Sequence, residues 1–177
     1  MAGAEARGGR AEAGIAVTLH GASGCATPIG QGVVDANGDF VVFANVNTNE
    51  ATPIYAILAD AAGNTSACTF LVSYVHDDRM PVAPSPHPSI VFTPPSPSLD
   101  DTTPILRGCA AEGVGVAIFT SDACLGASVA TLRALIVDAQ CPTGFAFGGA
   151  VPVSGPVSTT TFRGRTTNDA GVQSACV

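Results

Sequence analysis

An internal repeat is the feature that most constrains how this 177-residue chain can fold. Residues 9–20, which lead to Cys25, are similar to residues 108–119, which lead to Cys124. In both segments a glycine comes before an alternating run of β-branched and small residues, and the two cysteines are 99 positions apart. Self-similarity at a fixed offset is typical of proteins built from repeated modules.

The similarity returns at the other end of each copy. Residues 60–68 are similar to residues 168–176, and both segments end in Ser-Ala-Cys. Here the offset is 108 positions, so the second copy has about nine extra residues in its middle. Because the two ends agree in the same order, we predict two copies of one module.

Each copy has the hydrophobic pattern of β-strands. Residues 15–20 and 114–119 alternate Ile, Val, Leu or Phe with smaller residues, as a half-buried strand does. An Asn-Gly pair lies between the apolar runs 32–34 and 40–43 and indicates a hairpin, since both residues tolerate positive φ. We expect further strands at residues 54–59, 69–75, 129–137 and 159–166. With almost no helical period along the chain, the pattern predicts an all-β sandwich.

A proline-rich segment separates the two copies. Residues 81–97 contain seven prolines, which exclude a helix and favour an extended, semi-rigid chain. Within it, Ile90–Phe92 is typical of an edge strand bounded by prolines, and we expect it to open the second module. The predicted domains are therefore residues 1–78 and 79–177.

The cysteines indicate an oxidising compartment. The chain has six, the closest pair is Cys109 and Cys124, and none forms a Cys-x-x-Cys motif. A local zinc knuckle or thioredoxin-type redox site is therefore not predicted. An even number of widely spread cysteines favours disulfides, although small buried thiols in a cytosolic protein would also fit the pattern.

Charge and hydrophobicity exclude several classes of function. Charged residues make up 12% of the chain, the net charge is −7, and the seven positive residues are all arginine. No basic stripe could neutralise phosphates, so we expect no nucleic-acid binding. No apolar run is long enough to span a membrane, and residues 1–14 lack the apolar core of a secretory signal. If the protein is exported, the chain is either a fragment of a longer one, which we expect, or leaves the cell by another route.

These motifs resemble those of bacterial immunoglobulin-like (Big-type) repeats, the tandem modules of long surface and secreted proteins. The resemblance is carried by Gly-x-Ala-Glu-x-Gly-x-x-Val-Thr-Leu at residues 9–19, by Cys25 and by Asp-Ala-Ala-Gly-Asn-Thr-Ser-Ala-Cys at residues 60–68. Residues 74–77, the proline-rich segment and Asp100–Pro104 are similar to a junction between consecutive repeats. The resemblance implies two tandem antiparallel immunoglobulin-like β-sandwiches, the first of them without its opening strand.

The repeat, read with this resemblance, suggests how the cysteines pair. Cys25 with Cys68 and Cys124 with Cys176 would staple each module, and Cys109 would pair with Cys141. Six cysteines permit fifteen pairings, so the connectivity stays open at this point.

Candidate sites for chemistry are few. Asp77 and Asp78 before the proline-rich segment and Asp100 and Asp101 after it could converge on a calcium ion at the module junction. No nucleophile motif or carboxylate pair is present, so we expect no enzyme and no other cofactor. We expect the three histidines to face solvent, at these positions: 20, 76 and 87.

The sequence thus predicts non-catalytic structural or adhesive spacer modules of an exported bacterial surface or extracellular protein. One alternative is a module that binds a carbohydrate or protein ligand, with Phe145 and Phe147 as the first residues to test. Another is a subunit that exchanges a strand with its neighbours in an extracellular filament. An accessory domain of an enzyme is a third. The expected partners are neighbouring repeats, copies of the chain, or a surface protein or glycan.

Overall fold

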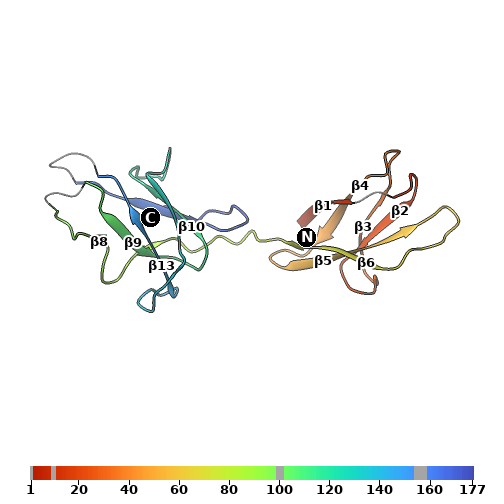
Figure 1. Cartoon of the computed structure of the whole chain (residues 1–177), viewed down its shortest axis with the longest axis horizontal. Coiled ribbons are helices and arrows are strands. Elements are labelled where there is room, and N and C mark those ends of the chain that lie inside the picture. Colours follow the sequence, from red (N-terminus) through yellow and green to blue (C-terminus); the bar gives the residue numbers. More distant parts are fainter. Residues whose placement is uncertain (1, 9–10, 99–101, 154–158) are drawn as a thin grey trace. The chain divides into compact units, whose positions relative to one another are not determined.

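The computed structural model describes residues 2–8, 11–98, 102–153 and 159–177. Every regular element in these ranges is a strand and every pairing is antiparallel (Figure 1). The all-β prediction is therefore confirmed. The chain divides into two compact units, residues 1–78 and 79–177, and the proline-rich segment opens the second unit. Among the described residues, no helix is long and apolar enough to cross a membrane.

The first unit consists of two sheets. Strand β1 (Ala2–Gly8) pairs with β4 (Phe40–Val46) in one of them. The other has the order β3-β2-β5-β6, and its strands have these bounds: β2 Ala16–His20, β3 Pro28–Val33, β5 Ala51–Ala59 and β6 Thr69–Val75. The sequence-based strands at 15–20, 54–59 and 69–75 are confirmed, whereas β1 had no counterpart among the predictions.

The core of the first unit lies between its two sheets. Along β4, the side chains of Phe40, Val42, Ala44 and Val46 are buried and those between them are exposed. They pack in one cluster with residues of the opposite sheet, at these positions: Val17, Leu19, Ile54 and Ala56. Alternation with period two turns one face of each sheet inward, so the unit is a β-sandwich.

The second unit has the same two-layer plan. One sheet has the order β11-β10-β14, and the other has the order β12-β13-β9-β7, with β8 also paired to β9. The bounds are β7 Ser85–Pro86, β8 Phe92–Thr93, β9 Ile105–Cys109, β10 Gly115–Phe119, β11 Ala130–Arg133, β12 Ile136–Val137, β13 Phe145–Ala150 and β14 Arg163–Thr167. Its core brings Leu106 and Phe147 from one sheet together with Val116 and Ile118 from the other.

The prediction of a hairpin around Asn37-Gly38 is wrong. A tight turn is present, because the carboxylate of Asp35 accepts the backbone N–H groups of Asn37 (2.8 Å) and Asp39 (3.0 Å). However, β3 before it pairs with β2, and β4 after it pairs with β1. The turn therefore connects the two sheets of the sandwich instead of two neighbouring strands.

Two other predicted strands differ in detail. The segment 129–137 forms two strands, β11 and β12, which belong to different sheets. The proline-bounded edge strand expected at Ile90–Phe92 is found as β8, at Phe92–Thr93, and β7 adds a second short pairing upstream. Both β7 and β8 lie along β9, in agreement with the rule that proline is tolerated in an edge strand.

Candidate functional site

All six cysteines form disulfides. The structure joins Cys25 to Cys68 and Cys124 to Cys176, with Cα–Cα distances of 5.9 and 5.8 Å. It also joins Cys109 to Cys141, at 5.4 Å. This connectivity is the one that the repeat suggested. The first two bonds occupy equivalent places in the two units, and both Cys25 and Cys124 have a positive φ, of 54° and 50°.

The loops before Cys68 in the first unit and Cys176 in the second are held in the same way. In the first unit, Oδ1 of Asp60 accepts the backbone N–H of Asn64 at 2.8 Å. In the second, Oδ1 of Asn168 accepts the backbone N–H of Val172 at 2.8 Å. Hydrogen bonds from the side chain and backbone of Asn64 lower the pKa of Asp60. Each side chain closes its loop and so places the following cysteine.

A buried histidine with a carboxylate partner lies in the second unit. His87 is 5% exposed, and its Nε2 lies 3.0 Å from Oδ2 of Asp138. Its Nδ1 accepts the backbone N–H groups of Ser89 and Ile90, at 3.2 and 3.1 Å, so Nε2 carries the proton that Asp138 accepts. A hydrogen bond from the backbone of Gln140, and then that from His87, lowers the pKa of Asp138. Both ring nitrogens are occupied in positioning the proline-rich entry segment.

The expectation that the histidines face solvent is therefore wrong for two of them. His87 is buried, and so is His20, which is 7% exposed at the end of β2. His76 is half-buried, and its Nδ1 accepts the backbone N–H of Asn49 at 3.1 Å. Solvent exposure of a histidine depends on which strands pack around it, and the sequence pattern does not report that.

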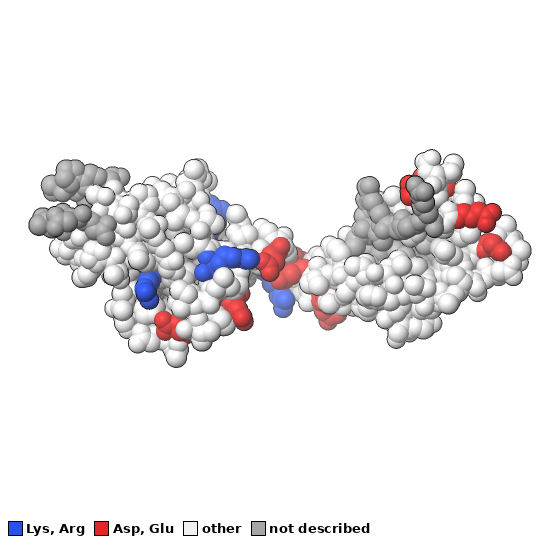
Figure 2. Space-filling model, viewed as in Figure 1, with Lys and Arg blue, Asp and Glu red and all other residues white. Residues whose placement is uncertain are grey.

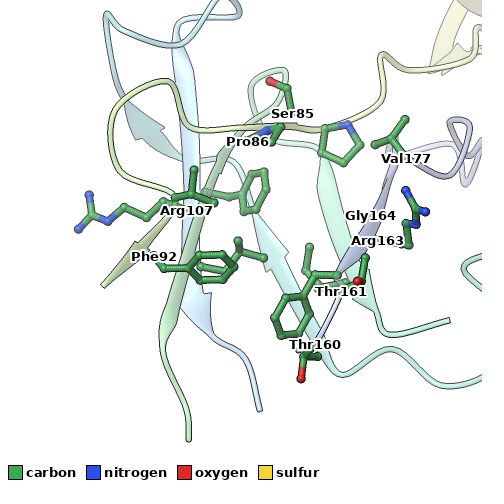
Figure 3. Close-up of a pocket in the computed structure, with 15 residues that line it drawn as sticks. Ser85, Pro86, Phe92, Arg107, Thr160, Thr161, Arg163, Gly164 and Val177 are labelled. Carbon is green, nitrogen blue, oxygen red and sulfur yellow. The ribbon is translucent and has the colours of Figure 1, made fainter. Parts of the chain in front are cut away.

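The second unit contains a groove of about 550 Å³. It lies between the segment entering β14 and the strands β7, β8 and β9, and Phe92 and Thr160 lie on opposite walls (Figure 3). Its lining is mainly apolar and includes Val91, Phe92, Leu106, Ile118, Phe147 and Phe162. A concave, mostly apolar surface with a few polar groups at its edge is the usual form of a binding site.

Phe145 and Phe147 are not exposed aromatic residues at loop tips. Phe147 is 3% exposed and belongs to the core of the second unit, where its ring contributes to the floor of the groove. Phe145 is half-buried and packs against the same core. Phe92, one of the aromatic residues that line the groove, lies in β8, which the sequence indicated only as an edge strand.

The carboxylates proposed for calcium are not brought together by the described residues. Asp100 and Asp101 lie outside those residues, and Asp77 and Asp78 belong to the first compact unit. The backbone N–H of Asp78 is donated to Oδ1 of Asn49 at 2.9 Å. In the part of the chain that the structure describes, no three His, Cys, Asp or Glu side chains form a group that could hold a metal ion. The calcium site remains a prediction.

Charged side chains are sparse on the visible face of each unit (Figure 2). Among the described ion pairs, Arg133 lies 2.8 Å from Asp169, and Arg163 lies 3.6 Å from Asp122. Both carboxylates are about nine-tenths exposed, so each pair contributes little to stability. The surface presents mainly uncharged side chains and backbone edges to any partner.

Comparison with known proteins assigns the first unit to a family. Residues 6–73 match the family described as bacterial Ig domain. No curated protein matches the chain. Among solved structures, the chain is similar to one described as "Biofilm associated protein - BSP domain", with 16% identity and a TM-score of 0.31. The similarity covers 93% of this chain and 24% of that one, so the chain spans about a quarter of that structure. The family match and the two facing sheets together identify the first unit as a bacterial immunoglobulin-like domain.

Proposed function

We propose that the chain is a non-catalytic structural or adhesive spacer of an exported bacterial protein, at the cell surface or outside the cell. The observation that carries the proposal is the set of three disulfides, which leaves no free cysteine. Disulfides of this kind persist in oxidising compartments and are rare in the cytosol. They fit modules that must stay folded outside the cell.

The proposal takes the second unit as a module of the same kind as the first. Support comes from equivalent elements: β10 and β14 pair as β2 and β5 do, and β13 pairs with β9 as β4 pairs with β1. The disulfides Cys124–Cys176 and Cys25–Cys68 also occupy equivalent places. The functional interpretation is then a row of stapled sandwiches whose role is to span distance and present a surface.

The location of the protein in its native cells tests this function. Intact cells are labelled with a membrane-impermeant amine- or carboxyl-reactive biotin reagent, and peptides of this chain are sought among the labelled proteins. Non-reducing mass spectrometry of the same sample counts the thiols. We expect labelled peptides and no free thiol. Six free thiols, or peptides found only in the cytosolic fraction, would remove the proposal.

A further inference from the structure

The second unit has an added hairpin where the first unit has a tight turn. The backbone N–H of Gly14 is donated to Val34 and that of Gly113 to Ala134, both at 2.9 Å, so Val34 and Ala134 hold equivalent places. In the first unit the turn Asp35–Asp39 follows and leads directly into β4. In the second unit a longer segment follows, and its strand β12 pairs with β13. The β12 hairpin is therefore an addition to the plan that the two units share.

The hairpin is held firmly to the rest of the second unit. Its loop carries Cys141, which is joined to Cys109 of β9. At the end of β12, Asp138 contacts the buried ring of His87, and its backbone N–H is donated to Gly144 at 2.9 Å. A surface fixed in this way loses little conformational freedom when it binds a partner.

The hairpin presents a run of apolar side chains to solvent. Leu135 is 65% exposed, Ile136 50% and Val137 80%. The last two form β12, which lies at the end of the sheet order β12-β13-β9-β7. Proteins usually protect such an edge with charge, proline or a covering segment, and a run of exposed apolar residues is unfavourable unless it has a function.

The backbone of the run is directed for pairing on its open side. The register places Ile136 opposite Ala146, and Asp138 donates to Gly144. Because backbone groups alternate in direction along an antiparallel strand, those of Ile136 face β13. The N–H and C=O groups of Val137, and of Leu135 where the extended chain enters β12, therefore face away from β13.

This edge is complementary to itself. When two copies approach in antiparallel orientation with Ile136 opposite Ile136, Leu135 of each copy lies opposite Val137 of the other. The outward backbone groups of these two residues can then pair, while the Ile136 pair forms the non-hydrogen-bonded position on the two-fold axis. The apolar side chains of the two runs cover one another in this register.

Charges at the two ends of the run favour the same arrangement. Arg133 precedes the run and Asp138 follows it, with side chains that are 55% and 24% exposed. Antiparallel pairing brings the acidic end of each run toward the basic end of the other. Opposite charges at the margin of an apolar contact favour encounter and fix its register.

We propose that β12 of one copy of the chain pairs antiparallel with β12 of a second copy. The contact is isologous, because each copy contributes the same surface, and it closes as a dimer. A contact made by so short a strand is weak, as small interfaces are, and many copies held close together strengthen it by avidity. The inference deepens the proposed function by naming the partner of an adhesive module, and it rests on that function for the setting in which copies meet.

Sedimentation of the full chain at increasing concentration tests the inference. We expect the weight-average mass of the wild type to rise toward that of a dimer. Val137→Lys places a charge on the open edge and should raise the dissociation constant by more than about tenfold. The matched control is Leu125→Lys, in the loop after the far end of β10, where Leu125 is 70% exposed. This variant should associate like the wild type. Circular dichroism and the count of native disulfides establish that both variants are folded.

Cross-linking measures the register without a variant that disrupts the contact. In the proposed dimer the two Ile136 Cα atoms are about 4.5 Å apart, which is within the range that a disulfide spans. Ile136→Cys should therefore form a covalent dimer under mild oxidation, and peptide mapping should find position 136 of one copy bonded to position 136 of the other. Leu125→Cys is the control and should cross-link much more slowly.

Three results would overturn the inference. The first is a wild type that stays monomeric up to about 1 mM or that grows beyond a dimer. The second is equal association of Val137→Lys and Leu125→Lys. The third is cross-linking of Ile136→Cys no faster than that of Leu125→Cys. None of these results bears on surface labelling or on the thiol count, so the proposed function stands or falls separately.

Discussion

At the scale of single residues, Asp138 shows how a surface carboxylate can hold a buried side chain in place. It accepts the Nε2–H of His87 at 3.0 Å and the backbone N–H of Gln140 at 2.9 Å. His87 in turn accepts two backbone N–H groups of the segment that enters the second unit. The three groups together determine where the proline-rich segment turns toward β8.

Asp138→Ala should therefore lower the urea concentration at which the second unit unfolds, because the Nε2–H of a buried imidazole loses its acceptor. Asp138→Asn keeps an acceptor oxygen and should cost less. Urea unfolding of both variants at pH 7 measures the difference. An equal loss in the two variants would show that the charge of Asp138, and not its hydrogen bond, is what matters.

Gly108 is required by a close approach of chain segments. A Cβ atom at this position would lie 2.6 Å from the carbonyl oxygen of Ser85 and would overlap the ring of Phe147. Gly108→Ala should cost about 1–3 kcal/mol, as overpacking of a core does. Gly115, in strand β10, is the matched control, because its nearest neighbour would be the carbonyl oxygen of Thr167 at 3.7 Å. Gly115→Ala should change the unfolding free energy by less than about 1 kcal/mol; a similar loss in both variants would contradict the argument.

At the scale of elements, the disulfides join strand ends that lie far apart in the sequence. The bond between Cys124 and Cys176 links the loop after β10 to the segment after β14, across a separation of 52 residues. Closing a loop of this length restricts the unfolded chain and stabilises the folded one by about 4 kcal/mol in the chain-entropy model. Cys124 is also buried, at 1% exposed, so its removal affects packing as well.

Replacing Cys124 and Cys176 together by alanine should lower the unfolding free energy of the second unit by about 4 kcal/mol. Chemical unfolding under non-reducing conditions measures it. The equivalent double replacement of Cys25 and Cys68, whose separation is 43 residues, is the control and should move the transition of the first unit instead. If both replacements moved the same transition, the two units would not be independent in stability.

At the scale of the whole molecule, acid should destabilise both units. The pKa of Asp35 is lowered from 3.8 by backbone hydrogen bonds from Asp39 and Asn37. Asp60 and Asp138 have lowered pKa values as well, for the reasons given above. A carboxyl whose pKa is lower in the folded state stabilises that state above the pKa of the unfolded chain. The contribution is lost as the pH falls through the folded value.

The free energy of unfolding should therefore be constant near neutral pH and decrease below about pH 4. Urea unfolding at pH 7, 5 and 3 follows the change. Asp60→Asn should reduce the loss of unfolding free energy of the first unit at acid pH, because the amide does not titrate. Its oxygen can still close the loop, as Asn168 does in the second unit. If this replacement left the loss of unfolding free energy at acid pH unchanged, the pH dependence would come from other carboxyl groups.

Mechanical extension of the chain tests the role of the disulfides in a spacer. The disulfide between Cys25 and Cys68 closes a loop of 43 residues, which a pulling force cannot extend while the bond is intact. Reduction should therefore lengthen the unfolding step of the first unit by about 150 Å, at about 3.5 Å per extended residue. Single-molecule pulling with and without reductant measures this step. Equal steps in the two conditions would mean that the bond does not limit extension.

The β-strands were predictable where alternation is strong. The segments that form β2 and β10 alternate large apolar with smaller residues, because one face of each strand packs into the core. Strand β1, Ala2–Gly8, contains no β-branched, aromatic or other large apolar residue and was missed. The expected pairing of β3 with β4 was wrong because alternation reports that a segment is a strand and does not report its partner.

The sequence by itself determined the repeat and the all-β class, and it suggested which cysteines pair without settling the connectivity. These features follow from local patterns and from comparison of one half of the chain with the other. Tertiary structure alone decided that the turn at Asp35–Asp39 crosses between sheets, that His87 is buried on Asp138, and that a groove lies beside β14. Each depends on contacts between segments far apart in the sequence, and the free energy of such contacts is set by packing rather than by local residue pattern.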